Sequence, residues 1–492
     1  WYRIDQDIDI ERHASTGYVF WFYGNVTVTM GTDTYSSGTD NSNRCINWTY
    51  VYGTTGKTYK LYAKNELYPW QYWYPQVGNS SWINGSQDAR MGTVHLKGGN
   101  IIGDFTIAET TNPKSIVLDG DMEFDGVTVG NTNTLDLNGQ RVEFGGLLNN
   151  QGILTDGGDK SLVLASNIDT TGTTRNISGA SDLILTGSGN IYWGATGGGW
   201  NTAFFNGGAF DTWAGQNVFG TCLIGSGDLD VLHDTTFNNI KVATGGELDG
   251  NSSTLTATGD FTTSGGLIGK SAYSSDGGAS NSGTGSGVGL SATTGPFTIE
   301  QWVKRADYSS GAEKHISQMH SLQIYFAAGG TFHVKCGDNS NLQTAAGNVN
   351  FSTTSGFGDD KWYHIAVVYD ATATRKRRAF VNGKEYALSN SDSAITLGNV
   401  NDYYIGRYFG STDYNLDGQI GYLRIWDEAR TAPEIRDGMF KRTPTDSNSK
   451  CKINLLFDEG TGTAVDNIGT AGAAGDGTLN AALWATGGTL SW

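Results

Sequence analysis

The chain has 492 residues, which is enough for two to four compact domains. Charged residues make up 16% of it, and 71 glycines accompany only 6 prolines and 12% aromatic residues. This composition is typical of short strands joined by tight turns. No long window has apolar residues at helical spacing. The sequence therefore predicts an all-β protein.

The net charge of −17 excludes a basic face that could neutralise nucleic-acid phosphates. No apolar run approaches the roughly 18 residues of a membrane span, so no membrane insertion is expected. The chain begins at Trp1 rather than Met, which indicates a processed or truncated product. Its four cysteines lie far apart without CxxC spacing, so they predict neither a metal knuckle nor a redox pair. For Cys336 and Cys451, in the same C-terminal region, a disulfide and two free buried thiols are both open.

Residues 1–98 predict an aromatic-rich β domain. The segment "YPWQYWYPQ" (residues 68–76) places five aromatic residues among nine. Sugars stack on exposed aromatic faces, so Trp70, Tyr72 and Trp73 are the candidate ligand-binding residues. The alternative, which we favour, is that the two prolines turn the chain and the rings fill a small core or a subunit interface.

Residues 99–270 consist of short apolar segments separated by Gly, Asn, Asp and Thr. Five apolar positions recur at an offset of 113 residues: Phe124, Val127, Val129, Leu135 and Val142 return as Phe237, Ile240, Val242, Leu248 and Leu255. Such short strands bury an apolar stripe only by stacking on one another. This region predicts a β-solenoid or stacked β-sheets, with a pair of ordinary sandwiches as the alternative. It resembles sections of bacterial surface proteins and of tailed-phage structural proteins.

Four acidic residues alternate at the start of the first of these repeats, at Asp119, Asp121, Glu123 and Asp125. Alternation places them on one face of a strand. They predict either a cation-binding face or, as we favour, a solvated edge that discourages unwanted strand pairing.

Residues 271–445 carry a series of strand motifs in a fixed order. They are "FTIEQWVK", "KWYHIAVVYD", "FVNGKE", "IGR" and "LDGQIGYLRIWDEARTAPEI". The Asn382-Gly383 pair predicts a tight hairpin. Together the motifs resemble the laminin-G-like, concanavalin A-like jelly roll, including its pentraxin relatives. The resemblance implies two antiparallel sheets in a sandwich whose loops bind sugars or proteins.

The same resemblance raises the question of calcium. Pentraxins hold a calcium pair with an early Asp-Asn loop and a later acid/amide cluster. Here the early loop, residues 319–321, has no carboxylate, and the later segment lacks a contiguous triplet. A pentraxin-type site is therefore not expected. A single-ion calcium site that uses Asp413 or Asp417 stays open, although calcium prefers six to eight oxygen ligands.

Catalytic motifs are not found. Glucanases of this sandwich class carry an E-x-D-x-x-E strand, and the sequence contains none. Glu300 has no acidic partner two or five residues away, so a solvated strand face is expected for it. His315 and His320 are expected at the surface or in turns, and the basic run at 375–378 in a solvated hairpin.

Residues 446–492 predict a β tail that either completes the sandwich or begins a further domain. The whole pattern favours a non-enzymatic structural and adhesive protein at an extracellular or virion surface. A tailed-phage fibre or capsid decoration protein with a lectin-like, glycan- or protein-binding sandwich is preferred. The alternatives are a secreted bacterial adhesin or fibril subunit and, third, a polysaccharide-degrading enzyme. Expected partners are further copies of the chain, other virion or fibre subunits, and cell-surface glycans.

Overall fold

In the computed structural model, side chains are described for only part of the chain. These parts are Ile107, Trp484 and residues 115–131, 133–156, 160–169, 181–191, 200–212, 220–243, 245–263, 283–290, 295–305, 307–308, 313–319, 322–336, 349–351, 357–389, 401–408, 414–443 and 449–480. Strands in the other segments are described by their backbone. The fold is almost entirely β, as the sequence predicted.

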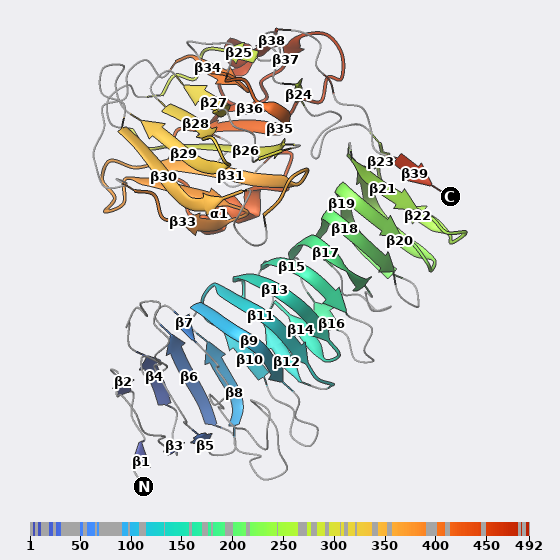
Figure 1. The fold of residues 1–492 in the computed structure, drawn as a ribbon, viewed down its shortest axis with the longest axis vertical. Coiled ribbons are helices and arrows are strands. Elements are labelled where there is room, and N and C mark those ends of the chain that lie inside the picture. Colours follow the sequence, from blue (N-terminus) through green and yellow to red (C-terminus); the bar gives the residue numbers. More distant parts are fainter. Residues whose placement is uncertain are drawn as a thin grey trace.

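The first half of the chain winds into a parallel β-solenoid, seen obliquely in Figure 1. Most of its coils contribute one strand to each of two sheets. The short-strand sheet contains β2 (Ile8–Ile10), β4 (Val26–Met30), β6 (Lys57–Ala63), β8 (Met91–Leu96), β10 (Ser115–Leu118), β12 (Thr134–Asp136), β14 (Ile153–Thr155) and β16 (Asn176–Ser178). The region 1–98 therefore contributes strands to the same sheet as the region that follows it.

The long-strand sheet forms the other side of the solenoid. It contains β7 (Glu66–Leu67), β9 (Gly99–Ile107), β11 (Met122–Val129), β13 (Arg141–Asn150), β15 (Leu162–Asp169), β17 (Asp182–Ile191), β18 (Thr202–Thr212), β19 (Asn217–Asp230), β20 (Thr235–Val242) and β22 (Leu255–Ala257), with β21 (Gly246–Asp249), β23 (Phe261–Thr262) and β39 (Thr489–Ser491) paired beside this path. A small third sheet joins β1 (Arg3–Ile4), β3 (Val19–Phe22) and β5 (Tyr50–Tyr52).

Inward-facing residues of the long-strand sheet stack into columns. One column runs through Met122, Val142, Val163, Leu183, Ala203, Cys222 and Ile240, all of them buried. Successive members are 18 to 21 residues apart, so this is the period of the coil. The predicted 113-residue repeat is not that period, because Val127 stacks with Leu148 and Leu229 in a different column from Ile240. The solenoid itself is confirmed.

Glycines lie at the irregular positions of several long strands, where the pairing register between neighbouring coils shifts. Gly208 and Gly227 both have positive φ, at 74° and 78°. A Cβ on Gly208 would lie 1.3 Å from the Gly187 carbonyl oxygen, and one on Gly227 would lie 2.3 Å from that of Gly208. Only glycine permits the backbones of neighbouring coils to approach so closely at these positions.

The second half of the chain forms an antiparallel two-sheet sandwich beside one end of the solenoid (Figure 1). Its docking sheet contains β24 (Tyr273–Asp276), β35 (Asp417–Trp426), β26 (Phe297–Arg305), β31 (Trp362–Tyr369), β32 (Arg377–Val381), β33 (Lys384–Tyr386) and β36 (Cys451–Leu455). Its far sheet contains β30 (Gln343–Asn350), β29 (Thr331–Cys336), β28 (Leu322–Phe326), β27 (Lys314–Met319), β34 (Tyr403–Ile405), β25 (Gly283–Gly285), β38 (Gly477–Leu479) and β37 (Ala464–Val465).

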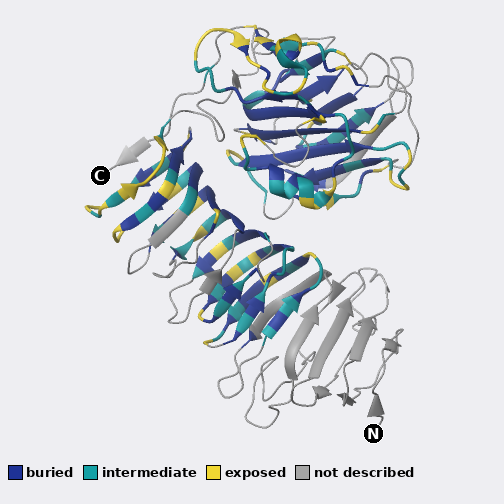
Figure 2. Ribbon diagram, turned by 180° about the vertical axis from the view of Figure 1, so that it is seen from behind, coloured by how far each residue is buried: buried dark blue, intermediate teal, exposed yellow. Residues whose placement is uncertain are grey.

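The sandwich is built as its motifs predicted. Asn382 and Gly383 both have positive φ and join β32 to β33 in a tight hairpin. Alternate residues of β26 point to opposite sides, so that Phe297 and Ile299 lie in the core between the sheets while Trp302 lies in a separate cluster outside it. Figure 2 shows that the described sandwich strands are buried along most of their length.

The tail connects the two halves. Strand β36 pairs with β35 and β38 pairs with β25, so these tail strands are part of the sandwich. The last strand, β39, then returns to the solenoid and pairs in parallel with β21. The sandwich is thus an insertion between two pieces of the solenoid, leaving after β23 and returning at β39.

One α-helix, α1 (Ala432–Gly438), is found among the described residues. It begins after Thr431, whose backbone N–H donates to the carboxylate of Glu434 at 2.7 Å in a capping interaction. Its Ile435 packs on the docking sheet. No helix in the described part of the chain is long and apolar enough to cross a membrane. Cys222, Cys336 and Cys451 are buried free thiols. Of the two alternatives for Cys336 and Cys451, the free thiols are therefore correct and the disulfide is not formed.

Candidate functional site

The outer face of the long-strand sheet meets the outer face of the docking sheet in an interface that we name the seam. On the solenoid side, one outward column runs through Glu123, Glu143, Leu164, Ile184, Phe204, Leu223, Lys241 and Thr262. Its four central members are apolar and buried, whereas charged residues flank them on both sides. The apolar stretch spans four consecutive coils and marks the footprint of the sandwich.

The sandwich covers this stretch with large rings. Trp302, Trp362 and Tyr422 project from three adjacent strands of the docking sheet into one apolar cluster with the solenoid residues. The Phe204 ring meets the Trp302 ring edge-on, with centroids 5.3 Å apart. Burial of several side chains of this size removes a large apolar area from water, which is the dominant stabilising contribution to such an interface.

Polar groups fix the register of the two halves. The Asn206 side chain donates to the Trp362 carbonyl at 2.6 Å and accepts from the Trp362 N–H at 2.7 Å. Lys361 Nζ donates to the carbonyl of Thr186 at 3.0 Å, and Arg141 Nε donates to that of Asn382 at 3.0 Å. Such paired buried bonds are directional, so they set one docking geometry rather than many.

Ion pairs surround the apolar centre. Arg436 of α1 pairs with Asp121 through both guanidinium ends, and Lys384 pairs with Glu123. Two of the four alternating acids therefore bind the sandwich. Their side chains stay 47% and 30% exposed, so this edge is solvated as expected, but it also holds Arg436 of α1 and Lys384 of β33, which come from more than 260 residues further along the chain.

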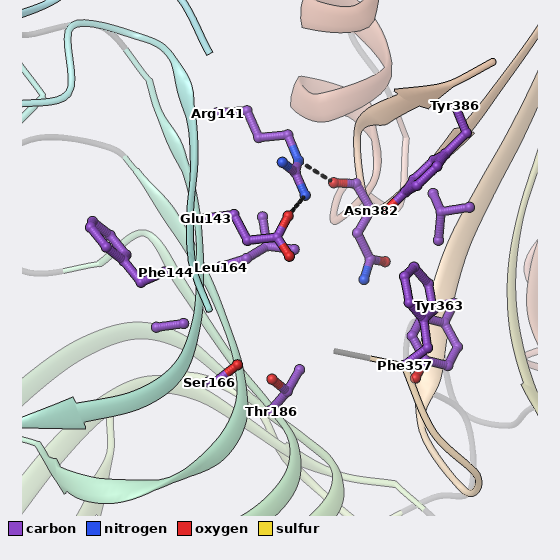
Figure 3. A pocket seen from close by; sticks show the side chains of 12 residues that line it. Arg141, Glu143, Phe144, Leu164, Ser166, Thr186, Phe357, Tyr363, Asn382 and Tyr386 are labelled. Carbon is purple, nitrogen blue, oxygen red and sulfur yellow. Dashed lines mark hydrogen bonds and ion pairs between the residues drawn. The ribbon is translucent and has the colours of Figure 1, made fainter. Parts of the chain in front are cut away.

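A small cavity lies in the seam, shown in Figure 3. On one side the Arg141 guanidinium binds Glu143 at 2.7 Å, and on the other the ring of Phe357 stacks on Tyr363 at 5.1 Å. Burial acts to raise the pKa of Glu143, but Arg141 and Lys384 hold it below its ordinary value. The cavity volume is about 30 Å³, which suits a water molecule and not a sugar ring.

Behind the seam, the docking sheet holds a buried charged network. Glu300 is fully buried, with its carboxylate 3.0 Å from Arg430 Nε and 3.7 Å from His364 Nε2. His364 Nε2 lies 2.7 Å from the Tyr422 hydroxyl. The prediction of a solvated Glu300 is wrong, because α1 and the segment before it cover this face. A carboxylate sealed in this way has no access to substrate, so the network is structural.

The outer face of the far sheet points away from the solenoid. A row of five rings crosses it, formed by His333, Tyr325, His315, Tyr408 and Tyr414. Successive centroids are 4.9 to 5.9 Å apart. We name this set the ring row. His315 was expected at the surface, yet it is buried within the row.

The ring row presents edges more than faces. His315 stacks on Tyr325, and Tyr325 stacks on His333, so these rings cover one another. Tyr414, at the other end of the row, is 36% exposed. Burial lowers the pKa of His315 to about 3, so its imidazole is neutral at physiological pH.

A second, polar row lies beside the rings. It consists of Lys335, Gln323, Gln318, Tyr404, Thr284 and Thr478 on six successive strands. Gln318 and Gln323 are buried in the middle, whereas Lys335, Tyr404 and Thr284 are half-buried and Thr478 is exposed. Apart from the Lys335 ammonium at one end, the two rows combine neutral donors, acceptors and aromatic rings on the side of the sandwich away from the seam.

The ligand-binding and calcium residues predicted from the sequence belong to neither of these rows. Trp70, Tyr72, Trp73 and Asp413 lie outside the described residues, as does His320. For Asp417 the structure shows a salt bridge: its two carboxylate oxygens accept from Arg305 at 2.5 and 3.0 Å. A cation at Asp417 would have to displace this guanidinium. Among the described residues, no group of three or more His, Cys, Asp or Glu side chains is arranged to hold a metal ion.

The basic run at 375–378 is only partly solvated. Arg377 is buried on β32, and Arg378 donates to the Arg430 carbonyl at 3.4 Å. Arg375 binds Glu385 at the surface. The expectation of a solvated hairpin thus holds for the first residue of the run and is wrong for Arg377, whose side chain enters the sandwich.

Residues 276–436 match the family described as the concanavalin A-like lectin/glucanases superfamily. The match and the two-sheet fold agree that this part of the chain is a concanavalin A-like domain. No curated protein matches the sequence.

Solved structures with a similar fold include three from different sources. A presumed carbohydrate-binding protein of Bacteroides ovatus is 18% identical over 43% of this chain and 58% of its own, with a TM-score of 0.32. A heptameric SAP-like pentraxin of Limulus polyphemus is 14% identical over 32% and 82%, with a TM-score of 0.23. The receptor-binding domain of botulinum neurotoxin D is 14% identical over 36% and 46%, with a TM-score of 0.29. At these values the similarities identify no ligand.

Proposed function

We propose that the protein is a non-enzymatic structural and adhesive protein, in which the solenoid is a stalk and the sandwich is a lectin-like module that binds glycans. The observation that carries this proposal is the seam. An apolar footprint, a bidentate amide contact and peripheral ion pairs hold the sandwich against the stalk in one orientation. The far sheet is thereby presented outward.

The chemistry of the described residues supports binding rather than catalysis. Hydrolysis of a glycosidic bond uses two accessible carboxyl groups, one of which has a raised pKa so that it can act as an acid. Glu300 is sealed, and Asp417 is bound to Arg305. The far sheet offers neutral imidazole, phenol, amide and hydroxyl groups, which suit the hydroxyls of a neutral glycan.

The setting that we prefer is the outside of a tailed-phage virion, as a fibre or capsid decoration protein. Several copies of the chain, or other fibre subunits, would then be its partners, and a cell-surface glycan its ligand. A repetitive solenoid that carries a side module suits such a role, because its length grows coil by coil without a new core. A secreted bacterial adhesin has the same physical requirements and is the alternative. Electron micrographs of the native source distinguish virions from free fibrils.

A glycan array tests the binding function directly. We expect the wild-type chain to bind at least one neutral glycan, and Tyr414→Ala and His333→Ala to reduce that signal at least five-fold. Phe261→Ala is the matched control, because Phe261 is a comparably exposed ring on the solenoid, at 40%. Repeating the array with EDTA tests a calcium requirement. A blank array would leave a purely architectural role, and release of reducing ends from a polysaccharide would overturn the non-enzymatic assignment.

A further inference from the structure

A second cavity opens at the edge of the seam, on the same coils as the first, between the coil turns at 139 and 160–162 and helix α1. Its volume is about 210 Å³, which corresponds to several water molecules at about 30 Å³ each. The lining residues are Gly139, Lys160, Ser161, Leu162, Asp182, Pro433, Arg436 and Asp437. Both halves of the chain therefore contribute walls to this one cavity, which we name the α1 pocket.

The charged groups of the α1 pocket balance one another. Lys160 Nζ lies 2.8 Å from an Asp182 oxygen and 3.3 Å from an Asp437 oxygen, so that one ammonium holds two carboxylates. Arg436 is used by Asp121 and by the Gly383 carbonyl. Two cations and two carboxylates thus line the pocket. Neither an anion nor a cation gains net attraction there, because each would have to break an existing pair.

The same groups keep unused hydrogen-bonding capacity. An ammonium has three N–H donors, of which two point to carboxylates, and each carboxylate has about four acceptor positions. Asp182 uses one oxygen for Lys160 and the other for the amide of Asn201 at 2.8 Å. Leu162, Pro433 and Gly139 add an apolar wall. Fixed donors, fixed acceptors and a small apolar surface are the combination that a neutral polyhydroxylated ring requires.

Catalysis by Asp437 is disfavoured by its charge state. Burial acts to raise the pKa of Asp437, but its bonds to Lys441 and Lys160 lower it below the ordinary value. A carboxylate held ionised in this way is a poor general acid. The pocket is therefore suited to bind a ligand without cleaving it.

We propose that the α1 pocket binds one neutral sugar unit, with Lys160, Asp182 and Asp437 as the polar contacts and Leu162 with Pro433 as the apolar wall. This inference rests on the proposed glycan-binding function and places a binding position at the seam in addition to the far sheet. Because the walls come from both halves, the site exists only while the sandwich is docked. A bound ligand would therefore also stabilise the docked arrangement.

Saturation-transfer NMR on the full chain tests the proposal. The probes are the methyl α-glycosides of glucose, galactose and mannose, with glucuronic acid as the charged comparison. We expect at least one neutral glycoside to bind and glucuronic acid not to bind. Asp437→Phe, which fills the pocket from a residue 37% exposed, should raise the dissociation constant at least ten-fold. Asp437→Asn, which keeps the shape, should raise it by a smaller factor.

Asp427→Asn is the matched control, because Asp427 is also partly exposed and ion-paired, with Lys452, but does not line the pocket. Thermal melts confirm that each variant folds. If a neutral glycoside binds Asp437→Phe as tightly as wild type, or if no neutral glycoside binds, the pocket proposal fails. In either case an array signal that Tyr414→Ala abolishes would leave the far-sheet function standing, so the two failures are distinguishable.

Discussion

The two faces of the long-strand sheet differ in how their apolar residues are distributed. On the inner face, every coil repeats an apolar residue, from Met122 to Ile240, because each coil must cover the next. In the outward column of the other face, only Leu164, Ile184, Phe204 and Leu223 are apolar, and Glu143 and Lys241 lie immediately beyond them. The inner face carries the residues that stack the coils on one another, whereas the outer face carries the residues that contact the sandwich. Changes that act on only one face can separate the two functions of this sheet.

The largest effect is expected at Phe204. Truncation of a fully buried Phe to Ala costs about 3–5 kcal/mol, and Phe204 contacts both Trp302 and Phe440 across the seam. We expect Phe204→Ala to uncouple the two halves, so that a single calorimetric transition of the wild type splits into two. The sandwich and the solenoid would then each keep their secondary structure.

The neighbouring Phe205 provides the matched comparison. It is the same residue type, is equally buried and points into the solenoid core, where it contacts Phe210. Phe205→Ala should destabilise the chain by a similar amount but lower the solenoid transition without splitting it from the sandwich. Identical calorimetric traces for the two variants would contradict the distinction between the faces.

A second effect concerns Lys241, at the boundary of the apolar footprint. Its Nζ is buried without a hydrogen-bond partner among the described residues. Burial, together with nearby Arg442, lowers its pKa to about 7, against the opposing effect of Asp458. The unfolded chain keeps this lysine charged up to about pH 10.4. Between these values the unfolded state binds more protons, so the free energy of unfolding rises with pH across that window and is lowest below pH 7.

Lys241→Met should remove that dependence. At about 1.4 kcal/mol per pKa unit, we expect a stabilisation of about 3–5 kcal/mol at pH 6, which shrinks as the pH approaches 10. Urea unfolding at several pH values measures it, with Lys335→Met on the far sheet as the control. A difference between wild type and Lys241→Met that is constant from pH 6 to pH 10 would count against a neutral buried amine.

The sequence predicts much of this fold, but the number of residues in one coil of the solenoid is not obvious from it. The apolar segments indicated a solenoid, yet the 113-residue offset skips several coils. A second signal is the glycine pair, which recurs at Gly145-Gly146, Gly207-Gly208 and Gly245-Gly246, at spacings of about three and two coils. The glycines are constrained by backbone contact between adjacent coils, but β15 has none, so the unbroken column of inward apolar residues gives the period more completely.

The sequence also indicates where the seam lies, but this pattern can be recognised only once the number of residues in one coil is known. Coils under the sandwich carry three consecutive apolar residues, as in Leu183–Leu185 and Ala203–Phe205, because both faces are buried. The coils beyond it read Val142-Glu143-Phe144 and Ile240-Lys241-Val242. The ion pairs with Asp121 and Glu123 could not be predicted in this way, since their partners Arg436 and Lys384 are distant in sequence. Pairing at that range follows only from the docked arrangement.

A smaller effect is expected at Asn206, which links the solenoid to the sandwich through the backbone of Trp362. Asn206→Ala leaves a buried N–H and a buried carbonyl of Trp362 without their partner, and each unsatisfied group costs about 1–3 kcal/mol. We expect a loss of about 2–4 kcal/mol together with faster hydrogen exchange at the Trp362 amide. Asn206→Asp, which keeps the acceptor but loses the donor, should retain protection of that amide. Equal exchange in both variants would argue against the bidentate contact.

The smallest effect is expected at the rim of the seam. Lys384 and Glu123 are each about 30% exposed, and exposed pairs contribute only about 0–1 kcal/mol because water and salt screen them. Lys384→Ala should therefore lower stability by less than 1 kcal/mol at low ionic strength, and the difference should vanish near 1 M salt. Phe204→Ala, whose effect is apolar, should show no such salt dependence. A salt-insensitive loss at Lys384 would mean that its stem packs against Tyr386, 5.2 Å from the ammonium, and that the rim also contributes through apolar contact.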